Sequence, residues 1–173
     1  MMRRVYLVGF MGAGKTTVGR RLAKRLGWTF ADTDYIAESE LGEKLTTVFA
    51  NKGELWFRKY ERQVLHGTSE LVDTVISTGG GTPCFYDNMD AILEKGLCFY
   101  LYLPPKAILS RLITSKKPRP LLHELTSEEL EGFIETTLER RDPFYRRAHF
   151  IIDALSPDIV RYIEMRIREH FEL

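Results

Sequence analysis

The sequence is poor in the residues that build disulfide frameworks and zinc sites. Of its 173 residues two are cysteine, Cys84 and Cys98, and four are histidine. They form no metal-binding spacing and no H-E-x-x-H motif. Two cysteines are too few for a disulfide scaffold, and Cys98 lies in an apolar run typical of a core. A disulfide-stapled domain is therefore excluded, and neither a structural zinc site nor a histidine-based hydrolase has support.

An excess of one charge and long apolar runs are also missing. The net charge is +1, which gives no general attraction to nucleic acid or to an anionic membrane. No apolar run reaches transmembrane length, and no N-terminal stretch has the length of a signal peptide. The composition, 44% hydrophobic and 28% charged, is typical of a globular protein. We expect one domain over residues 1–173 in the cytoplasm, with no nucleic-acid or membrane partner.

A phosphate-binding loop stands near the N-terminus. Residues 9–16, Gly-Phe-Met-Gly-Ala-Gly-Lys-Thr, fit the pattern G-x-x-x-x-G-K-[ST]. Glycines let a backbone turn its N–H groups toward an anion, Lys15 adds a charge for terminal phosphates, and the Thr16 hydroxyl suits Mg²⁺. An apolar run at 5–8 precedes the loop, and a helical pattern ending at Gly27 follows it. A chance glycine-rich turn would not require these flanks, so we predict a triphosphate at the helix N-terminus.

Strand-like and helix-like segments alternate along the rest of the chain. Thr126 and Glu129 predict a capping box, and Ser156-Pro157 predicts the start of the last helix. The alternation implies an α/β fold with a five-stranded parallel sheet, covered on both faces, whose ligands bind beyond the carboxyl ends of the strands. The later strands are predicted at 28–30, 74–77, 97–103 and 150–152, and helices at 16–26, roughly 54–71, 87–95, 105–114, 127–141 and 157–171.

Two carboxylates follow the second predicted strand. Asp32 and Asp34 occupy alternate positions, where both can point the same way. A phosphoryl transferase needs one carboxylate to help hold hydrated Mg²⁺, and gains from another that positions an acceptor hydroxyl and takes its proton. Asp34 could instead cap a helix that begins at Tyr35, although capping explains only one member of the pair.

A glycine triplet at 79–81 follows the third predicted strand. Three consecutive glycines cost conformational entropy, so they indicate close approach by a ligand or another backbone. Arg58 lies on the helix predicted over 54–71, roughly opposite an apolar stripe of Trp56, Tyr60 and Val64. Periodicity alone therefore favours either surface exposure of Arg58 or a pair with a nearby glutamate.

Residues 114–124 depart from the alternating pattern, with two prolines and three cations between two predicted helices. They could form a solvated basic loop or a mobile lid that brings Arg119 over bound phosphates; beside a phosphate loop we favour the lid. Arg140 and Arg141 end the next predicted helix, where compensation of the helix dipole is the simplest explanation.

Five motifs follow the phosphate loop in order: Asp32-Thr33-Asp34, Phe57-Arg58-x-x-Glu61, Gly79-Gly80-Gly81, Arg119-Pro120-Leu121-Leu122 and Arg141-x-Pro143-x-Tyr145. This ordered set resembles that of shikimate kinases, over nearly the whole chain. The phosphate loop alone is shared by many nucleotide enzymes, but the combination is specific. The resemblance implies a P-loop, nucleoside-monophosphate-kinase-like fold with a lid. It also implies ATP-dependent phosphorylation of the 3-hydroxyl of shikimate, giving shikimate 3-phosphate and ADP, in aromatic amino acid (chorismate) biosynthesis.

The resemblance also implies a role for each matching residue. Thr16 would ligate Mg²⁺ with help from Asp32, while Asp34 would bind the acceptor hydroxyl and act as the base. Lys15 and Arg119 would act on the transferred phosphoryl group. Shikimate would contact Arg58, Gly79, Gly80, Gly81 and Arg141. ATP would contact Gly12, Ala13, Gly14, Lys15, Thr16, Thr17, Arg111, Arg119 and Pro157.

The loop before the last helix departs from the family pattern. Relatives often carry a basic or polar residue there on the adenine side, but this loop reads Ala154-Leu155-Ser156-Pro157, and backbone groups could replace that contact. The resemblance implies two small-molecule partners, shikimate and ATP, and a monomeric enzyme.

Two other interpretations remain open. The chain could be a kinase with another acceptor, such as gluconate or a nucleoside monophosphate, or a nucleotide-binding switch or scaffold without transfer activity. A nucleotide acceptor would need base-recognition groups, and the glycine triplet with two separated arginines suits a small carboxylate better. The presence of Asp34, Arg58 and Arg141 together argues against a scaffold.

Overall fold

One parallel sheet organises the chain. The structure is a computed structural model that describes residues 3–115, 122 and 125–173. All neighbouring strands are parallel, in the order β2-β3-β1-β4-β5, so the predicted α/β fold is confirmed. The five strands lie within about two residues of their predicted positions. They are β1 (Arg4–Val8), β2 (Thr29–Asp32), β3 (Thr74–Ser77), β4 (Leu97–Tyr102) and β5 (Phe150–Asp153).

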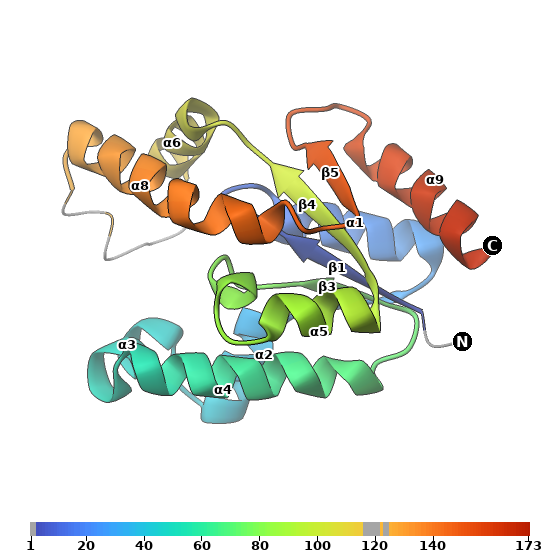
Figure 1. The fold of residues 1–173 in the computed structure, drawn as a ribbon, viewed down its shortest axis with the longest axis horizontal. Helices are drawn as coiled ribbons and strands as arrows, with labels where there is room; N and C mark the ends of the chain where they lie inside the picture. Colours follow the sequence, from blue (N-terminus) through green and yellow to red (C-terminus); the bar gives the residue numbers. More distant parts are fainter. Residues whose placement is uncertain (1–2, 116–121, 123–124) are drawn as a thin grey trace.

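Helices cover the sheet on both faces. α1 packs against α9 on one face, and α5 and α8 lie on the other (Figure 1). α2, α3 and α4 form a separate group beside the β2 side of the sheet, in the lower part of the same view. The described helices are α1 (Lys15–Leu26), α2 (Thr33–Leu41), α3 (Leu45–Lys52), α4 (Glu54–Gly67), α5 (Asn88–Lys95), α6 (Pro105–Thr114), α8 (Ser127–Tyr145) and α9 (Ile159–Phe171), with 3₁₀ turns η1 (Thr68–Glu70) and η2 (Thr82–Cys84).

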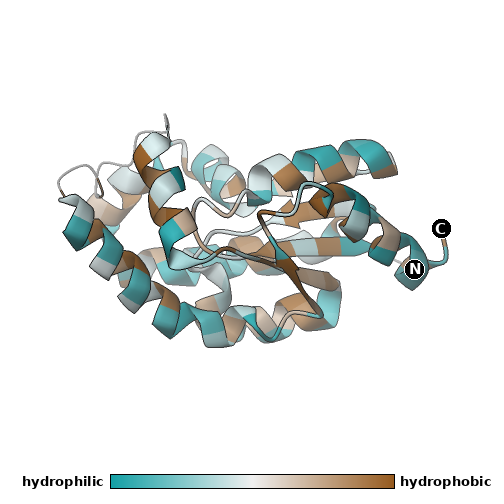
Figure 2. Cartoon of the chain, turned by 90° about the horizontal axis from the view of Figure 1, so that it is seen from above, coloured by the Kyte–Doolittle hydropathy of each residue, from teal (hydrophilic) through white to brown (hydrophobic). Residues whose placement is uncertain are grey.

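The core explains why the strands were predictable. β1 is central, and all five of its residues are buried, as a strand covered on both faces requires. Apolar residues gather on the strands and the inner faces of the helices, and polar residues on the outer faces (Figure 2). Gly27 ends α1 in the left-handed conformation, with φ 69°, and Thr126 and Glu129 form the predicted capping box. No helix in the described ranges is both long and apolar enough to span a bilayer.

Some helix predictions need correction. α2 and α3 lie where no helix was predicted, because they bury few residues: Thr33 and Ala37 in α2, and Val48 in α3. An apolar stripe that narrow is not distinguishable from a loop. The last helix begins at Ile159 rather than at Pro157, and α8 continues through Pro143 to Tyr145.

Candidate active site

The phosphate loop joins β1 to α1 and closes around its own lysine. Gly14 precedes the helix in the left-handed conformation, with φ 95°, which favours glycine. Lys15 is buried, and its Nζ donates to the carbonyl oxygens of Gly9 at 2.7 Å and Phe10 at 3.0 Å. The ammonium group therefore lies at the mouth of the loop, where it can meet an anion.

A cavity of about 420 Å³ opens beside the loop. It lies beyond the carboxyl ends of β1, β2 and β3, where ligands of parallel sheets bind. Its position brings together the loop, both aspartates, the end of β3 and the end of α6. Its lining residues are Met11, Gly12, Gly14, Lys15, Thr16, Thr17, Asp32, Asp34, Ser77, Thr78, Gly80, Arg111 and Ser115.

Asp32 has a structural role and also faces the cavity. Its Oδ1 accepts from the backbone N–H groups of Asp34 at 3.1 Å and Tyr35 at 3.4 Å, so Asp32 caps α2. The alternative in which Asp34 is the cap is wrong. Oδ2 of Asp32 accepts a 3.0 Å hydrogen bond from the hydroxyl of Thr16.

The Thr16–Asp32 pair fits Mg²⁺. One hydroxyl and one carboxylate oxygen face the cavity together, and Mg²⁺ takes few protein oxygens alongside phosphate and water. No group of three or more histidine, cysteine or acidic side chains in the described part of the chain could hold a metal alone. An ion at this pair would therefore need phosphate oxygens or water as further ligands.

Asp34 is partly buried in the wall of the cavity. Burial, reinforced by the negative charges of Asp32 and Glu61, raises the pKa of Asp34 to about 6, with Lys15 acting in the opposite direction. A carboxyl group with a pKa close to neutral can take and return a proton at physiological pH.

Each glycine of the triplet lies against a different charged side chain. A Cβ on Gly79 would come within 2.6 Å of Oδ1 of Asp34, and a Cβ on Gly81 within 2.7 Å of an Nη atom of Arg58. A Cβ on Gly80 would lie 3.5 Å from an Nη atom of Arg141. The close approach inferred from the triplet is present, and it brings the three side chains around one loop.

Arg58 is buried, and the expectation of surface exposure is wrong. Only 7% of it is exposed, and it pairs with Glu54 and Glu61, so the alternative of a glutamate pair is confirmed. Of the predicted apolar stripe only Val64 is buried: a buried ion pair occupies much of the inner face of α4, while Trp56 and Tyr60 stack on each other outside it. Hydrophobic periodicity counts charged residues as exposed and misses this arrangement.

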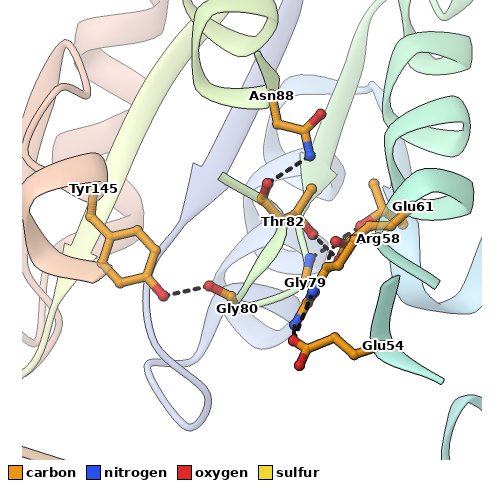
Figure 3. A network of polar contacts seen from close by, with 9 residues as sticks. Glu54, Arg58, Glu61, Gly79, Gly80, Thr82, Asn88 and Tyr145 are labelled. Atoms are coloured by element: carbon orange, nitrogen blue, oxygen red, sulfur yellow. Dashed lines mark hydrogen bonds and ion pairs between the residues drawn. The ribbon is translucent and has the colours of Figure 1, made fainter. Parts of the chain in front are cut away.

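A polar network extends from Arg58 to α5 (Figure 3). Nη1 of Arg58 donates to Oε2 of Glu61 at 2.9 Å, and Oε1 of Glu61 accepts from the hydroxyl of Thr82 at 2.6 Å. Nδ2 of Asn88 donates to the carbonyl oxygen of Thr82 at 2.8 Å. On the other side of the triplet, the hydroxyl of Tyr145 donates to the carbonyl oxygen of Gly80. Thr82 and Asn88 carry no signal in the sequence.

Comparisons with known proteins agree with this geometry. The model of the shikimate kinase family matches residues 11–169 of this chain. The chain belongs to the shikimate kinase family. It is 46% identical over 153 residues to the shikimate kinase of Parabacteroides distasonis, covering 88% of each chain. A solved shikimate kinase from Bacteroides thetaiotaomicron is 39% identical, with a TM-score of 0.91 over 100% of both chains. Another, from Acinetobacter baumannii in complex with shikimate, is 36% identical, with a TM-score of 0.84 over 99% of this chain and 93% of the other.

The family assignment confirms the resemblance, the P-loop kinase fold and the function inferred from the motifs, phosphorylation of shikimate. It makes the chain a small-molecule phosphotransferase, with ATP as the co-substrate of the family. Other acceptors and a scaffold without activity are thereby disfavoured.

In this shikimate kinase family member, the residues expected on the adenine side are only partly brought together. Nη1 of Arg111 donates to the carbonyl oxygen of Gly12 at 3.0 Å, and Nη2 to that of Ala154 at 3.3 Å, which ties the phosphate loop to the loop before α9. Pro157 instead lines a second cavity of about 400 Å³ beside α1. Arg119 and most of the lid predicted at 114–124 lie outside the described residues.

Proposed function

We propose that the cavity binds ATP and shikimate side by side and transfers the terminal phosphoryl group to the 3-hydroxyl, giving shikimate 3-phosphate and ADP. The observation that carries this proposal is the position of Asp34. Its carboxylate lies against Gly79, between the phosphate loop and the triplet that contacts Arg58 and Arg141.

The nucleotide side consists of the loop and α1. Backbone N–H groups from Gly12 to Thr17 would hold the phosphates, and Lys15 would exchange its carbonyl partners for phosphate oxygens. Thr16 and Asp32 would hold Mg²⁺, which supplies charge neutralisation on the phosphates when bound. Arg111 would flank adenine. Pro157 would contribute to the adenine site only through the backbone of the loop that contains it. Arg119 would compensate charge on the transferred group.

The acceptor side consists of α4, α8 and the glycine triplet. Arg58 and Arg141 would grip the substrate carboxylate, because a guanidinium matches a carboxylate with paired N–H groups. The backbone of Gly80 would contact the ring. Asp34 would orient the hydroxyl and accept its proton as the oxygen attacks phosphorus.

The proposal includes a monomeric, cytoplasmic enzyme. Among the described residues, the phosphate loop, both aspartates, the end of β3 and the end of α6 line one cavity within a single chain, which is consistent with a monomer. Gel filtration with light scattering, run with and without ATP, tests the monomer; a mass of two chains would contradict it.

The direct test is ADP release across a panel of acceptors. We expect turnover with shikimate and none with gluconate or a nucleoside monophosphate. Chelation of Mg²⁺ should abolish the turnover with shikimate. Equal turnover with gluconate would contradict the assignment of shikimate as the acceptor. Turnover in the presence of a chelator would contradict the assignment of Mg²⁺ to the site.

A further inference from the structure

Two glutamates, one buried and one exposed to solvent, pair with the guanidinium of Arg58. Both come from α4, at the positions four before and three after the arginine. The side chain of Glu61 is 4% exposed and that of Glu54 is 59% exposed. One partner of Arg58 is therefore part of the protein interior, and the other lies in solvent.

The edges and faces of the guanidinium are differently occupied. Glu61 accepts from Nη1, and one oxygen of Glu54 accepts from both Nε at 3.3 Å and Nη2 at 3.2 Å. The centroid of the Phe85 ring lies 4.1 Å from the guanidinium carbon, and Gly81 lies against both Nη atoms. Figure 3 shows Glu54 at the end of the network opposite Asn88. The edge from Nε to Nη2 is thus the one whose present partner faces solvent.

We propose that Glu54 is a specificity-determining residue that stands in for the substrate carboxylate. In the substrate-free enzyme its carboxylate occupies the Nε–Nη2 edge of Arg58, and shikimate binds there by exchanging with it. This inference rests on the proposed assignment of Arg58 to the substrate carboxylate.

The exchange favours one glutamate over the other. Glu54 makes two bonds longer than 3 Å through a single oxygen, and its exposed carboxylate is solvated by water whether or not it pairs with Arg58, so its release costs little. Glu61 is buried and also accepts from Thr82, so its removal would leave an unpaired interior charge. A carboxylate arriving from solvent therefore replaces Glu54.

The exchange would discriminate by charge. While Glu54 holds Arg58, the buried guanidinium always has an exposed counter-charge, and only a ligand with its own carboxylate can replace it. An uncharged ligand would leave the Arg58–Glu54 pair in place and gain nothing from that edge. The selectivity for carboxylates is set by competition as well as by attraction.

Glu54→Gln tests the exchange, because glutamine keeps the size of the side chain and removes its charge. We expect the Kd of shikimate, measured by calorimetry, to fall by about two- to fivefold, or at most about 1 kcal/mol, because the exposed carboxylate of Glu54 stays largely hydrated while it pairs with Arg58. The KM for shikimate should fall with it, whereas the Kd of the uncharged methyl ester of shikimate should not change. Glu169→Gln is the matched control, because Glu169 is 55% exposed and pairs with Arg166 on α9, away from the cavity.

Weaker shikimate binding in Glu54→Gln would overturn the inference and make Glu54 a support for Arg58. An unchanged Kd, or an equal gain for the methyl ester, would also overturn it. Glu54→Asp, which shortens the side chain by one methylene, provides the same comparison should Glu54→Gln fold poorly. Arg58→Lys separates this failure from failure of the proposed function: if Arg58→Lys leaves the Kd of shikimate unchanged, the assignment of Arg58 itself is wrong.

Discussion

The hydroxyl of Tyr145 holds the carbonyl oxygen of Gly80, and Arg141, one turn earlier on α8, faces the same glycine. One helix therefore fixes both the triplet and the cation that lies against it. Tyr145 is fully buried, and the centroid of its ring lies 5.1 Å from the centroid of the Tyr100 ring. Removal of the hydroxyl alone tests the hydrogen bond without creating a large cavity.

Tyr145→Phe should weaken shikimate binding and leave ATP binding nearly unchanged. The variant leaves a part-buried acceptor on Gly80 without its partner, which typically costs about 1–3 kcal/mol. We expect a higher KM for shikimate and a lower melting temperature. Tyr162→Phe, on α9, is the matched control. A Tyr145→Phe enzyme with native KM would show that the triplet keeps its position without this bond.

Asp34 predicts the acidic limb of the pH profile. Because its pKa is raised to about 6, kcat/KM for shikimate should rise with pH up to about 6 and then level off, as the base loses its proton. Asp34→Asn should lower turnover by about 10² to 10⁴-fold and abolish that limb. Steady-state rates between pH 4.5 and 8 provide the measurement, and a limb that persists in the variant would assign the base elsewhere.

Asp34 also predicts a gain of stability on substitution. A folded-state pKa above the ordinary value of 3.8 means that stability is lost as pH rises from about 4 to 6, where the buried carboxyl must ionise. An asparagine side chain carries no such charge, so Asp34→Asn should melt higher than the wild type at pH 7, by about 2–4 °C for each kcal/mol, and by less at pH 4. Equal melting temperatures at both pH values would contradict the raised pKa. Because Asp32 and not Asp34 caps α2, Asp34→Asn leaves the helix cap intact, and loss of a cap does not contribute to the change in melting temperature.

The sequence predicted the sheet because buried parallel strands are apolar throughout. It predicted the phosphate loop and the aspartate pair because their residue types have few other uses next to a strand. It did not predict α2 and α3, since helices that bury one or two side chains show no periodicity. For Arg58 the glutamate pair was predicted but the burial was not, because burial of the pair depends on distant residues such as Thr82, which bonds to Glu61 and lies 24 residues from Arg58 in the sequence. Likewise, the bond from Tyr145 to Gly80 joins residues 65 positions apart.

Lys15→Met should abolish turnover while the protein remains folded. The ammonium donates to the carbonyl oxygens of Gly9 and Phe10, and solvent in the adjoining cavity can replace it there. In the reaction it would balance phosphate charge, and loss of one such donor typically lowers kcat by about 10² to 10³-fold. ADP release and circular dichroism, compared with Lys24→Met on the outer part of α1, test this. Near-native turnover in folded Lys15→Met would contradict the assignment of the phosphate loop.

Arg58 and Arg141 should behave as a pair toward one carboxylate. Gly81 lies against the first and Gly80 against the second, so the two guanidinium groups lie beside neighbouring residues of one loop. Arg58→Lys and Arg141→Lys keep the charge but lose the planar fork, and each should weaken shikimate binding by about 1–3 kcal/mol, the scale of a charge-assisted hydrogen bond. ATP affinity measured alone should hardly change. The double variant should lose less than the sum of the single losses, because both residues act on one group. Strict additivity would place the two arginines on separate groups of the substrate, and loss of ATP affinity with shikimate affinity intact would move them to the nucleotide side.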